Sequence, residues 1–550
     1  MSATMAPPTK RQPLRPFPWR FVTWYVTTWA VYKLAPDYKV SLWWAWPATW
    51  CLLALGYFTL WLCVLHPLYF SRLRHIPTVP GFPLWGHFFS IITEECGLPQ
   101  RHWHRKYGPI IRYYFPFGAE RLSIADDAAL KYMTVKNPYN FPKPSRAAQW
   151  MQRILGNGVL LAEGADHVLQ RKALTHGFST QSINDLMPAF WEKSLLLGDM
   201  WRQQMEDAGA TRKSIEVLEW LNRCTLDIIA RVGFGIEIDC LRDQTAPIRK
   251  AYQLVFNFNF ASRALHGIQA FFPWSKHLPV QMNRDMEEAR GIIHGKATEI
   301  IKERLDDAKN NSRGKDILAL MAKENMRLED QGREAMSFDT MRDQVMTFLG
   351  AGHDTTATGV VWTLHLLSIY PKVQTRLREE IRQYMPYLFD KDGRHDAVKL
   401  NMVHPDTLPY LNNVCRESLR YIPPIPLTVR EVKKDCTLGS YDVPAGTIVY
   451  VLANAINRLE SFWGDTADEF DPDRWDKLPE TATTNAFMTF LQGPRGCIGR
   501  KFAETEMKVM LCTLLSMFEF ERDYATPDPE QWYVFCRITR QGNDVTDIVD

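Results

Sequence analysis

The sequence predicts a mainly α-helical protein with a small β-sheet region, behind an N-terminal membrane anchor. Seven long segments place apolar residues at helical spacing, whereas β-like runs are confined to two stretches. Residues 41–70 contain no Asp, Glu, Lys or Arg. We therefore expect an anchor over residues 1–74, a proline-rich hinge over 75–86 and one large domain over 87–550.

The uncharged stretch 41–70 is dominated by Trp and Leu and exceeds the roughly 20 apolar residues needed to cross a bilayer. Arg72 and Arg74 follow it and predict a cytosolic end for this span. An earlier apolar stretch, 21–32, either lies in the membrane interface or forms a short first span. One span and a two-span hairpin therefore both stay open, whereas a cleaved signal peptide is disfavoured because the long run exceeds a signal sequence.

The composition is that of a globular protein with a large core. Apolar residues make up 46% of the 550 residues, and a formal net charge of +3 gives no reason to expect a nucleic-acid partner. The ten cysteines show neither the paired C-x-x-C pattern of a zinc site nor a disulfide framework. The large domain is therefore expected in a reducing compartment.

The spacing of apolar residues predicts helices over 183–204, 214–231, 282–309, 341–370, 372–384, 408–421 and 500–518. Two short β-like runs lie within 110–125, and another lies within 439–452. The hinge contains Pro77, Pro80 and Pro83, whose fixed φ angles prevent a helix. We therefore expect a stiff connection between the anchor and the large domain.

One cysteine lies in a loop that is suited to metal binding. Residues 490–499 read F-L-Q-G-P-R-G-C-I-G and precede the predicted helix 500–518. A cysteine binds metal as the thiolate, and the unpaired N–H groups of a helix N-terminus lower the pKa of a thiol. Gly493 and Gly499 permit turns and close approaches, and Arg495 adds a fixed cation. The ordinary alternative for Cys497 is a small buried hydrophobic residue.

The spacing F-x-x-G-x-R-x-C-x-G resembles the heme-binding loop of the cytochromes P450 at every fixed position, from Phe490 to Gly499. The resemblance implies the cytochrome P450 fold for the large domain and heme b as its cofactor. It also implies that Cys497 is the axial ligand of the heme iron, and that Phe490, Gly493, Arg495 and Gly499 help to bind the heme.

The predicted helix 341–370 follows a capping candidate, Ser337, and ends at Pro371. Its roughly 30 residues correspond to about 45 Å, enough to cross a domain. Its middle, residues 350–356, reads G-A-G-H-D-T-T and groups poor helix formers together. A local conflict of this kind often marks a functional site, although a kink in a packed helix is the structural alternative.

Within this segment, Gly352 offers space and a weakened hydrogen-bond ladder, and Thr355 offers a hydroxyl. Asp354 is an acid that can relay protons. The segment resembles the oxygen-activation motif of the same family, A/G-G-x-D/E-T. The resemblance implies catalytic roles for Ala351, Gly352, Asp354 and Thr355, whereas His353 occupies the variable position and receives none.

Two further motifs resemble the family. Glu417 and Arg420 are spaced to pair on one helix face, and Arg474 lies in F-D-P-D-R-W, which resembles the family's P-E-R-F segment with Asp473 and Trp475 as departures. The resemblance implies a buried charge network of Glu417, Arg420 and Arg474 that locks the structure.

The two heme propionates need cations. The sequence offers Arg495, Arg430 and the pair His167 and Arg171, which resembles the family's W-x-x-x-R helix with His in place of Trp. A histidine can still donate a hydrogen bond to a carboxylate, and a solvent-facing His167 is the alternative.

By this resemblance the protein is a heme-thiolate monooxygenase that inserts one oxygen atom from O₂ into a small hydrophobic substrate. The thiolate of Cys497 pushes electron density toward iron, and Asp354 and Thr355 deliver protons. The chain has no Gly-rich dinucleotide fingerprint. A separate NADPH-cytochrome P450 reductase, with cytochrome b5 as a second donor, is therefore expected at an endoplasmic reticulum membrane, with the catalytic domain in the cytosol.

The expected role is a tailoring step in specialised metabolism. Three alternatives stay open: a hydroxylase of fatty acids or other lipids, an O₂-independent heme-thiolate isomerase or dehydratase, and a heme protein without an organic substrate. Isomerases and dehydratases of this family tend to lack the acid and threonine found at Asp354 and Thr355.

Overall fold

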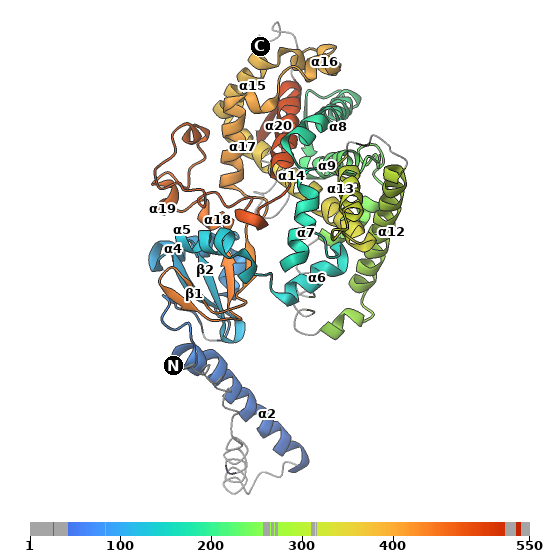
Figure 1. Ribbon diagram of the computed structural model, residues 1–550. Helices are drawn as coiled ribbons and strands as arrows, with labels where there is room; N and C mark the ends of the chain where they lie inside the picture. Colours follow the sequence, from blue (N-terminus) through green and yellow to red (C-terminus); the bar gives the residue numbers. More distant parts are fainter. Residues whose placement is uncertain are drawn as a thin grey trace, which may run out of the picture.

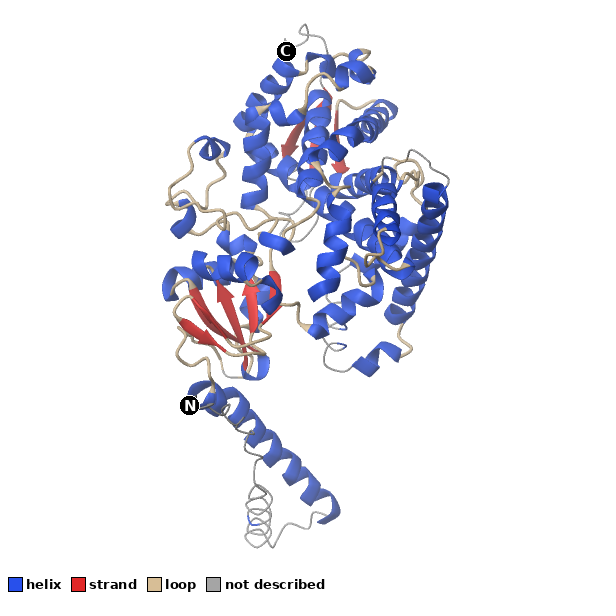
Figure 2. Ribbon diagram, viewed as in Figure 1, coloured by secondary structure: helices blue, strands red, loops and turns tan. Residues whose placement is uncertain are grey.

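The computed structural model describes residues 42–82, 84–256, 273–309, 316–522 and 535–540, together with the single residues 26, 265, 269 and 314. In Figure 1 a long N-terminal helix leaves a body in which helices predominate. Figure 2 shows strands in two places, one beside the N-terminal helix and one among the helices at the other end. The expected mainly helical fold with a small sheet is confirmed. The apolar stretch 21–32 falls, apart from Val26, outside the described residues, so both topologies of the anchor stay predictions.

The helical part is built around α14 (Phe338–Ile369), which packs against α9 (Val217–Phe234), α12 (Gln281–Lys309), α17 (Pro409–Tyr421) and α20 (Arg500–Met517). The side chain of Ser337 accepts a hydrogen bond from the N–H of Thr340 at 3.2 Å, so the expected cap is confirmed and the helix begins three residues earlier than predicted. Such a long helix can support a site far from both of its ends.

The remaining helices surround this core or cover the sheet. They are α3 (Phe88–Thr93), α4 (Leu98–Tyr107), α5 (Asp127–Lys131), α6 (Ser145–Leu155), α7 (Gly164–Thr175), α8 (Thr180–Asp207), α10 (Pro247–Phe256), α13 (Ile317–Asp330), α15 (Pro371–Tyr384), α16 (Ala397–Leu400), α18 (Ala453–Ile456) and α19 (Glu460–Trp463). Short 3-10 or π segments are η1 (Trp61–Phe70), η2 (Pro116–Gly118), η3 (Tyr132–Lys136), η4 (Pro138–Asn140), η5 (Pro273–His277), η6 (Pro386–Phe389), η7 (Gly393–His395), η8 (Pro405–Thr407), η9 (Pro472–Asp476) and η10 (Gly493–Arg495).

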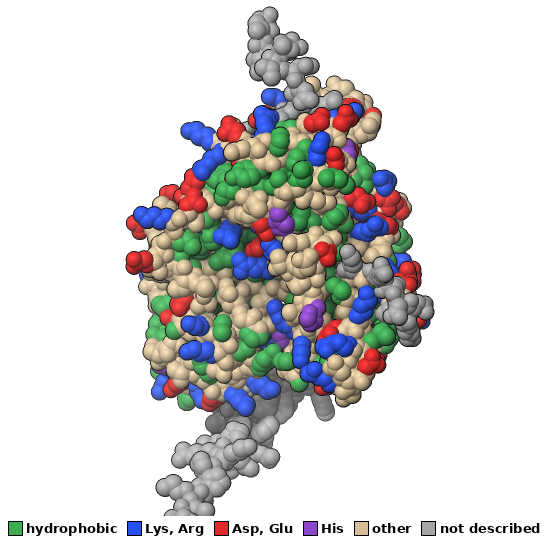
Figure 3. All heavy atoms as spheres, turned by 45° about the horizontal axis from the view of Figure 1, so that its top comes forward, with side chains coloured by type: hydrophobic (Ala, Val, Ile, Leu, Met, Phe, Trp, Pro, Cys, Tyr) green, Lys and Arg blue, Asp and Glu red, His purple; other side chains and the backbone are tan. Residues whose placement is uncertain are grey.

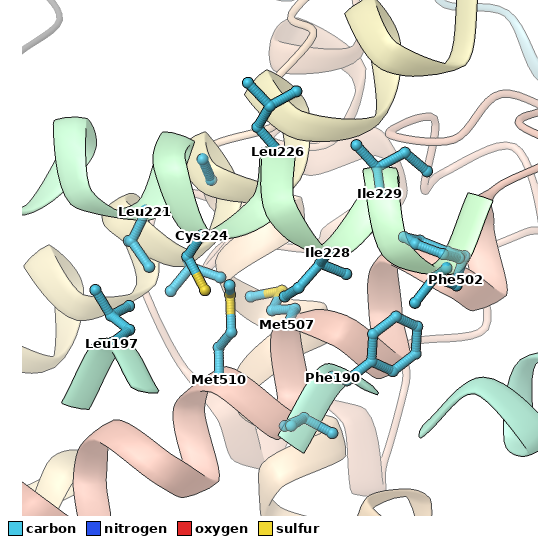
Figure 4. Packing of buried hydrophobic residues seen from close by; sticks show 14 of the residues in the cluster. Phe190, Leu197, Leu221, Cys224, Leu226, Ile228, Ile229, Phe502, Met507 and Met510 are labelled. Carbon is cyan, nitrogen blue, oxygen red and sulfur yellow. The ribbon is translucent and has the colours of Figure 1, made fainter. Parts of the chain in front are cut away.

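The main apolar core lies where α8, α9 and α20 meet. Figure 4 shows side chains from the three helices in contact, among them Phe190 of α8, Ile228 of α9 and Met507 of α20. These three residues are almost completely buried. Since α20 directly follows the cysteine loop, the packing of α20 in this core fixes the C-terminal end of the loop.

The main sheet has four strands in the order β1 (Ile110–Phe115), β2 (Ala119–Ile124), β7 (Ile448–Val451) and β4 (Thr428–Glu431). The pair β1 and β2 is antiparallel, β2 and β7 are parallel, and β7 and β4 are antiparallel. A second sheet has the order β3 (Arg212–Glu216), β9 (Phe535–Arg540) and β8 (Phe518–Arg522), and β5 (Cys436–Leu438) pairs with β6 (Tyr441–Val443).

Two local predictions were wrong. The helix expected over 214–231 begins at Val217, because residues 214–216 belong to β3. That strand pairs with β9, where Ser214 lies opposite Arg537, and a partner so distant in sequence leaves no local signal. The single strand expected within 439–452 is two strands, β6 and β7, of different sheets.

The apolar N-terminal segment is helical throughout its described length. Helix α2 (Leu42–Leu60) continues into η1, and residues Cys51–Phe70 form one helix that is long and apolar enough to cross a membrane. Most of its surface lies outside the protein body, so a packed core helix does not account for its apolar character.

The hinge is attached to the sheet. The backbone N–H of Val79 donates to the carbonyl of Arg112 at 2.8 Å, and the N–H of Arg112 donates to the carbonyl of Pro77 at 2.8 Å. Ile76 and Val79 are buried, with 2% and 3% of their surface exposed. Residues 77–79 of the predicted hinge therefore extend the edge of β1.

The buried side chain of Arg112 joins three segments at this point. It donates to the carboxylate of Glu120 in β2 at 2.7 Å, to the hydroxyl of Thr78 at 2.9 Å, and to the carbonyl of Pro67 in η1 at 3.3 Å. A buried guanidinium with several acceptors is costly to disrupt. Arg112 thus clamps the end of the apolar helix to the sheet.

Candidate active site

The cysteine loop folds back on itself before α20. The N–H of Cys497 donates to the carbonyl of Phe490 at 2.8 Å, and the N–H of Gly496 donates to the carbonyl of Gly493 at 2.9 Å. Gly493 has φ of 70°, and a Cβ there would overlap the carbonyl oxygen of Thr134. Glycine is therefore required at this position for both conformation and space.

Gly499 differs from Gly493. Its φ of −86° suits any residue, and a Cβ there would lie 3.8 Å from Phe178 and 4.0 Å from the sulfur of Cys497, which is ordinary contact. A turn and a close approach were expected at both glycines. They are found at Gly493, whereas the protein fold alone does not require glycine at position 499.

The sulfur of Cys497 is available to a ligand. The residue is exposed, although enough protein surrounds it that burial raises the pKa of its thiol. The N–H of Gly499 and the positive charges of Arg171 and Arg500 oppose that increase. The pKa of the thiol, expected to be lowered at a helix N-terminus, is thus raised overall; the thiolate at Cys497 stays a prediction, and a bound cation would stabilise that anion.

Phe178 connects this loop to α14. It contacts the Cβ position of Gly499, and its ring centroid lies 5.3 Å from that of Phe348, which is about two turns before Thr355 on the same helix. Glu506, nine positions after Cys497, lies against Thr356 of α14. Helix α14 therefore crosses the region in front of the cysteine loop.

The residues expected to activate oxygen lie within the uninterrupted helix α14, so the weakened hydrogen-bond ladder expected at Gly352 stays a prediction. Ala351, Gly352, Asp354 and Thr355 are all half-buried. The hydroxyl of Thr355 donates to the carbonyl of Ala351 at 2.9 Å. A Cβ at Gly352 would lie 3.0 Å from Ile229 of α9, so this position is tightly packed on the α9 side.

His353 differs from these four residues. It is buried, its Nδ1 lies 2.6 Å from the carbonyl of Leu349, and its ring stacks edge-on against Tyr252. The hydroxyl of Thr225 donates to the carbonyl of His353 at 3.0 Å. The residue therefore packs between α14, α9 and α10.

A cluster of basic side chains lies beside the cysteine loop. It comprises Lys143, His167, Arg171, Arg430 and Arg495, whereas the carboxylate near them is that of Glu163. Arg495 pairs with Glu163 and also lies 4.9 Å above the ring of Tyr139. The expected residues His167, Arg171, Arg430 and Arg495 are thus brought together.

Electrostatics in this basic cluster disfavour the charged forms. Burial lowers the pKa of Lys143 to about 7, and the charges of Arg430 and Arg495 contribute. Burial, aided by Arg495 and Arg171, lowers the pKa of His167 to about 4. Burial lowers the pKa of Arg430 to about 10. Among the described residues, Glu163 is the carboxylate that faces Lys143, Arg430 and Arg495, so the site favours an anionic ligand.

A heme fits this donor set. Its two propionates would supply negative charge beside the basic cluster, and Cys497 would offer its sulfur to the iron. Arg171 donates to the carbonyl of Gly496 at 2.6 Å, so one cation of the cluster is tied directly to the cysteine loop. The side chain of His167 is buried, which rules out the solvent-facing alternative, and its Nδ1 lies 3.0 Å from the hydroxyl of Tyr139.

Sequence patterns did not identify Lys143 or Tyr139. Tyr139 lies in η4 and Lys143 between η4 and α6, a stretch that carries no motif. The backbone N–H of Lys143 donates to Glu163 at 3.0 Å, and the Tyr139 ring lies under Arg495. The Pro residues on either side of Lys143, which hold it in an extended backbone, are the one local signal.

Glu506 of α20 is a further functional candidate that no sequence motif indicated. Its side chain is completely buried, and neither carboxyl oxygen has a hydrogen-bond partner among the described residues. Burial raises the pKa of this carboxyl well above its usual range, and the neighbouring Thr356 hydroxyl offsets this only in part. Burial therefore favours the protonated form of Glu506, which lies beside Thr356 of α14.

The expected charge network is present. Both oxygens of Glu417 accept from Arg420, at 2.7 and 2.8 Å, and Arg474 lies 3.3 Å from the same carboxylate. Trp475 adds an indole N–H donor to Glu417 at 3.0 Å, so this departure from the family pattern supplies a further bond. Asp473, the other departure, pairs with Arg376 on the surface.

Comparison with known proteins agrees with this geometry. The family model for cytochrome P450 matches residues 76–542. The chain is 33% identical to cytochrome P450 monooxygenase FUM15 of Gibberella moniliformis, over 84% of this chain and 85% of the relative. It is 31% identical to cytochrome P450 monooxygenase ALT8 of Alternaria alternata (88% and 90%) and 33% identical to cytochrome P450 monooxygenase sphH of Aspergillus fumigatus (83% and 84%). The chain therefore belongs to the cytochrome P450 family and is an oxidoreductase that incorporates oxygen with the help of heme iron.

Proposed function

We propose that this protein is a heme-thiolate monooxygenase that modifies a small hydrophobic metabolite in a tailoring step of specialised metabolism. The observation that carries the proposal is the exposed Cys497, with the basic cluster beside it and α14 linked to the same loop through Phe178. A structural cysteine would need neither the excess cations nor the access.

Each residue of the site has a separate proposed role. Cys497 ligates the iron of heme b, and Lys143, His167, Arg171, Arg430 and Arg495 hold the propionates. When bound, the heme supplies the activation of O₂. Asp354 is the acid that moves a proton along α14, and Thr355 orients its hydroxyl through its bond to Ala351. Gly352 and Ala351 keep this stretch free of bulky side chains.

The substrate is expected to be apolar. Segments that border the pocket in the family, 144–159 and 425–429, are mostly apolar, and the described residues of 255–260 include the buried Val255. The relatives are fungal monooxygenases, which supports a tailoring role over the alternative of fatty-acid or other lipid hydroxylation. The test is a binding screen in which hydrophobic compounds are added to the ferric protein and the Soret band is recorded. If the compounds that shift the band share one scaffold, that scaffold identifies the substrate class.

We expect electrons from a separate NADPH-cytochrome P450 reductase, with cytochrome b5 as a second donor. The candidate basic residues are not equivalent: Arg500 pairs with Glu504 at 2.9 Å, and Lys501 pairs with Asp406. Lys433 and Lys434 are exposed, and no ion pair involves them among the described residues. Figure 3, which turns the α15 and α16 end of the molecule forward, shows acidic and basic side chains interspersed with apolar ones on that face. Lys433 and Lys434 are therefore the better candidates for a purely attractive contact.

The proposed location is the endoplasmic reticulum membrane, with residues 1–74 as the anchor, 75–86 as the hinge and 87–550 as the catalytic domain in the cytosol. One apolar helix of sufficient length and the adjacent Arg72 and Arg74 support this topology. Protease protection of the first 74 residues in microsomes, with digestion of the rest, tests it.

The direct test of the function is a Cys497→Ser substitution. The unsubstituted protein, loaded with heme, reduced and treated with carbon monoxide, is expected to show the absorption maximum of thiolate ligation, and Cys497→Ser should lose it. Cys512→Ser is the matched control, because that buried cysteine lies in α20 beside Cys415, Glu380 and Lys508, none of which is a proposed cofactor residue. A thiolate spectrum that survives Cys497→Ser would refute the proposal.

A further inference from the structure

A groove runs along the junction between the apolar helix and the body. It has a volume of about 830 Å³ and lies between the end of η1 with the residues that follow it, Tyr69 to His75, and the β5–β6 hairpin, Asp435 to Pro444. Figure 1 shows that the apolar helix leaves the molecule at this end, beside the main sheet. The groove thus lies where the chain would emerge from a membrane.

The rim of the groove has the composition of a membrane–water boundary. Tyr69 and Phe70, the last residues of η1, have 61% and 60% of their surface exposed. Aromatic side chains gather at the level of lipid headgroups, and basic residues follow them on the water side, as Arg72 and Arg74 do here. The groove is therefore at headgroup depth if the helix spans a membrane.

The charges that line the groove are not all paired. Arg72 pairs with Asp435 at 2.9 Å, and Asp435 also accepts from the N–H of Ala445 at 2.7 Å, so this pair is internally satisfied. Arg74 donates only to the carbonyl of Tyr69, at 2.8 Å, among the described residues.

On the hairpin side, Asp442 accepts one hydrogen bond, from the hydroxyl of Thr437 at 3.0 Å, and no cation pairs with it among the described residues. Both Arg74 and Asp442 are exposed. One cation and one carboxylate therefore face the same groove without counter-charges.

A single ligand that carries both signs would pair with both. A phosphate diester accepts hydrogen bonds from a guanidinium, and a primary ammonium donates up to three hydrogen bonds to a carboxylate. A quaternary choline ammonium has no N–H to donate, and a glycerol headgroup has no positive charge. The unpaired charges therefore favour a headgroup with phosphate and primary ammonium.

We propose that this groove binds the headgroup of a phospholipid of the phosphatidylethanolamine class, with its phosphate on Arg74 and its ammonium on Asp442. The inference rests on the proposed insertion of the N-terminal helix into a membrane. It gives the anchor a lipid contact that fixes the depth of the catalytic domain at the membrane surface.

The test uses the full-length heme-loaded protein in nanodiscs that contain equal amounts of phosphatidylethanolamine, phosphatidylcholine and phosphatidylglycerol. Native mass spectrometry counts the lipids that remain on the protein after release. We expect the ethanolamine lipid to be retained several-fold over the other two. Arg74→Gln and Asp442→Asn should each lower its retention by about threefold, since an exposed charged contact is worth up to about 1 kcal/mol.

The matched controls are Arg333→Gln and Asp330→Asn, which change exposed residues of the same types near the end of α13. They should leave lipid retention unchanged. Equal retention of the three lipids, or preference for phosphatidylglycerol, overturns the proposal, because either result removes the role of Asp442. The same outcome follows if the control variants lose the ethanolamine lipid to the same extent.

The failure of the proposed function is distinguishable. The carbon monoxide spectrum is recorded on the same nanodisc samples. A thiolate spectrum without lipid preference overturns this inference alone, whereas lipid preference in protein without that spectrum overturns only the proposed catalysis. A chain that does not enter the nanodiscs overturns the lipid site together with the anchor.

Discussion

Two buried arginines, ten residues apart, have opposite surroundings. All three guanidinium nitrogens of Arg420 donate, to Glu417 and to the carbonyls of Asn457, Ala467 and Glu469, at 2.7 to 2.8 Å. Arg430 is buried to a similar degree, but it donates one hydrogen bond among the described residues, to the carbonyl of Val429 at 3.1 Å. A buried cation whose donors are filled by the protein stabilises the fold, whereas one whose donors are unfilled is available to a ligand.

Disrupting the hydrogen-bonded network around Arg420 should have the largest effect on stability. Arg420→Leu leaves the buried carboxylate of Glu417 without its bidentate partner and three carbonyls without a donor, so we expect a loss of about 3–5 kcal/mol in the free energy of unfolding. Urea unfolding followed by circular dichroism measures it. A loss below about 1 kcal/mol would show that the network contributes little to stability.

Disrupting the basic cluster around Arg430 should weaken heme binding and leave stability almost unchanged. Arg430→Met removes a cation that burial and the charge of Arg495 disfavour, so the fold should tolerate it, but a charge-assisted bond to a propionate is worth about 1.5–3 kcal/mol. We expect heme to transfer to apomyoglobin about tenfold faster, with the urea midpoint changed little. Arg430→Lys, which keeps the charge, should recover part of the retention. A change in unfolding as large as that of Arg420→Leu would erase the distinction between the clusters.

Glu506 extends the comparison to a buried acid that has no cationic partner among the described residues. Because burial raises its pKa, the folded state holds a proton that the unfolded state releases above the ordinary pKa near 4.5, so stability falls as pH rises. Glu506→Gln should match the unsubstituted protein near pH 4 and become more stable with rising pH, by up to about 1.4 kcal/mol per pH unit. Thermal unfolding from pH 4 to 8 measures the gap; parallel curves would mean that Glu506 is ionised in the folded state.

The smallest effect should come from a pair that is not buried. Asp473 and Arg376 lie 2.8 Å apart, with 51% and 52% of their side-chain surfaces exposed. Asp473→Asn should cost less than about 1 kcal/mol, and salt should reduce even that difference. Urea unfolding at low and high salt checks this. A cost near that of Arg420→Leu would show that burial does not separate the two ion pairs.

The parts that sequence predicts well are those encoded by neighbouring residues. The cap at Ser337, the start of α20 at Arg500 and the pairing of Glu417 with Arg420 all depend on residues within four positions of each other. The family motif around Cys497 is equally local. Such features leave a pattern that one sequence displays.

The features that the sequence did not predict depend on contacts between distant segments. Lys143 becomes a cofactor candidate only because Arg430 and Arg495, nearly 300 or more residues later, approach it. Glu506 lies on the apolar side of a helix whose pattern gives no reason to expect an isolated acid. The strand β3 exists because β9 pairs with it. Long-range packing decides these outcomes, and propensity does not.

The clamp at Arg112 has a practical consequence for exchanging the membrane segment with that of another protein. A junction at Phe70 keeps the bond from the Ser71 hydroxyl to Glu120 at 2.6 Å and the strand-like bonds of Pro77 and Val79, and it replaces the Pro67 carbonyl with another backbone carbonyl. A junction after Gly81 removes all of these and uncovers the edge of β1. The tolerant splice site therefore lies just before Ser71, several residues ahead of the proline-rich stretch where a sequence-based design would place it.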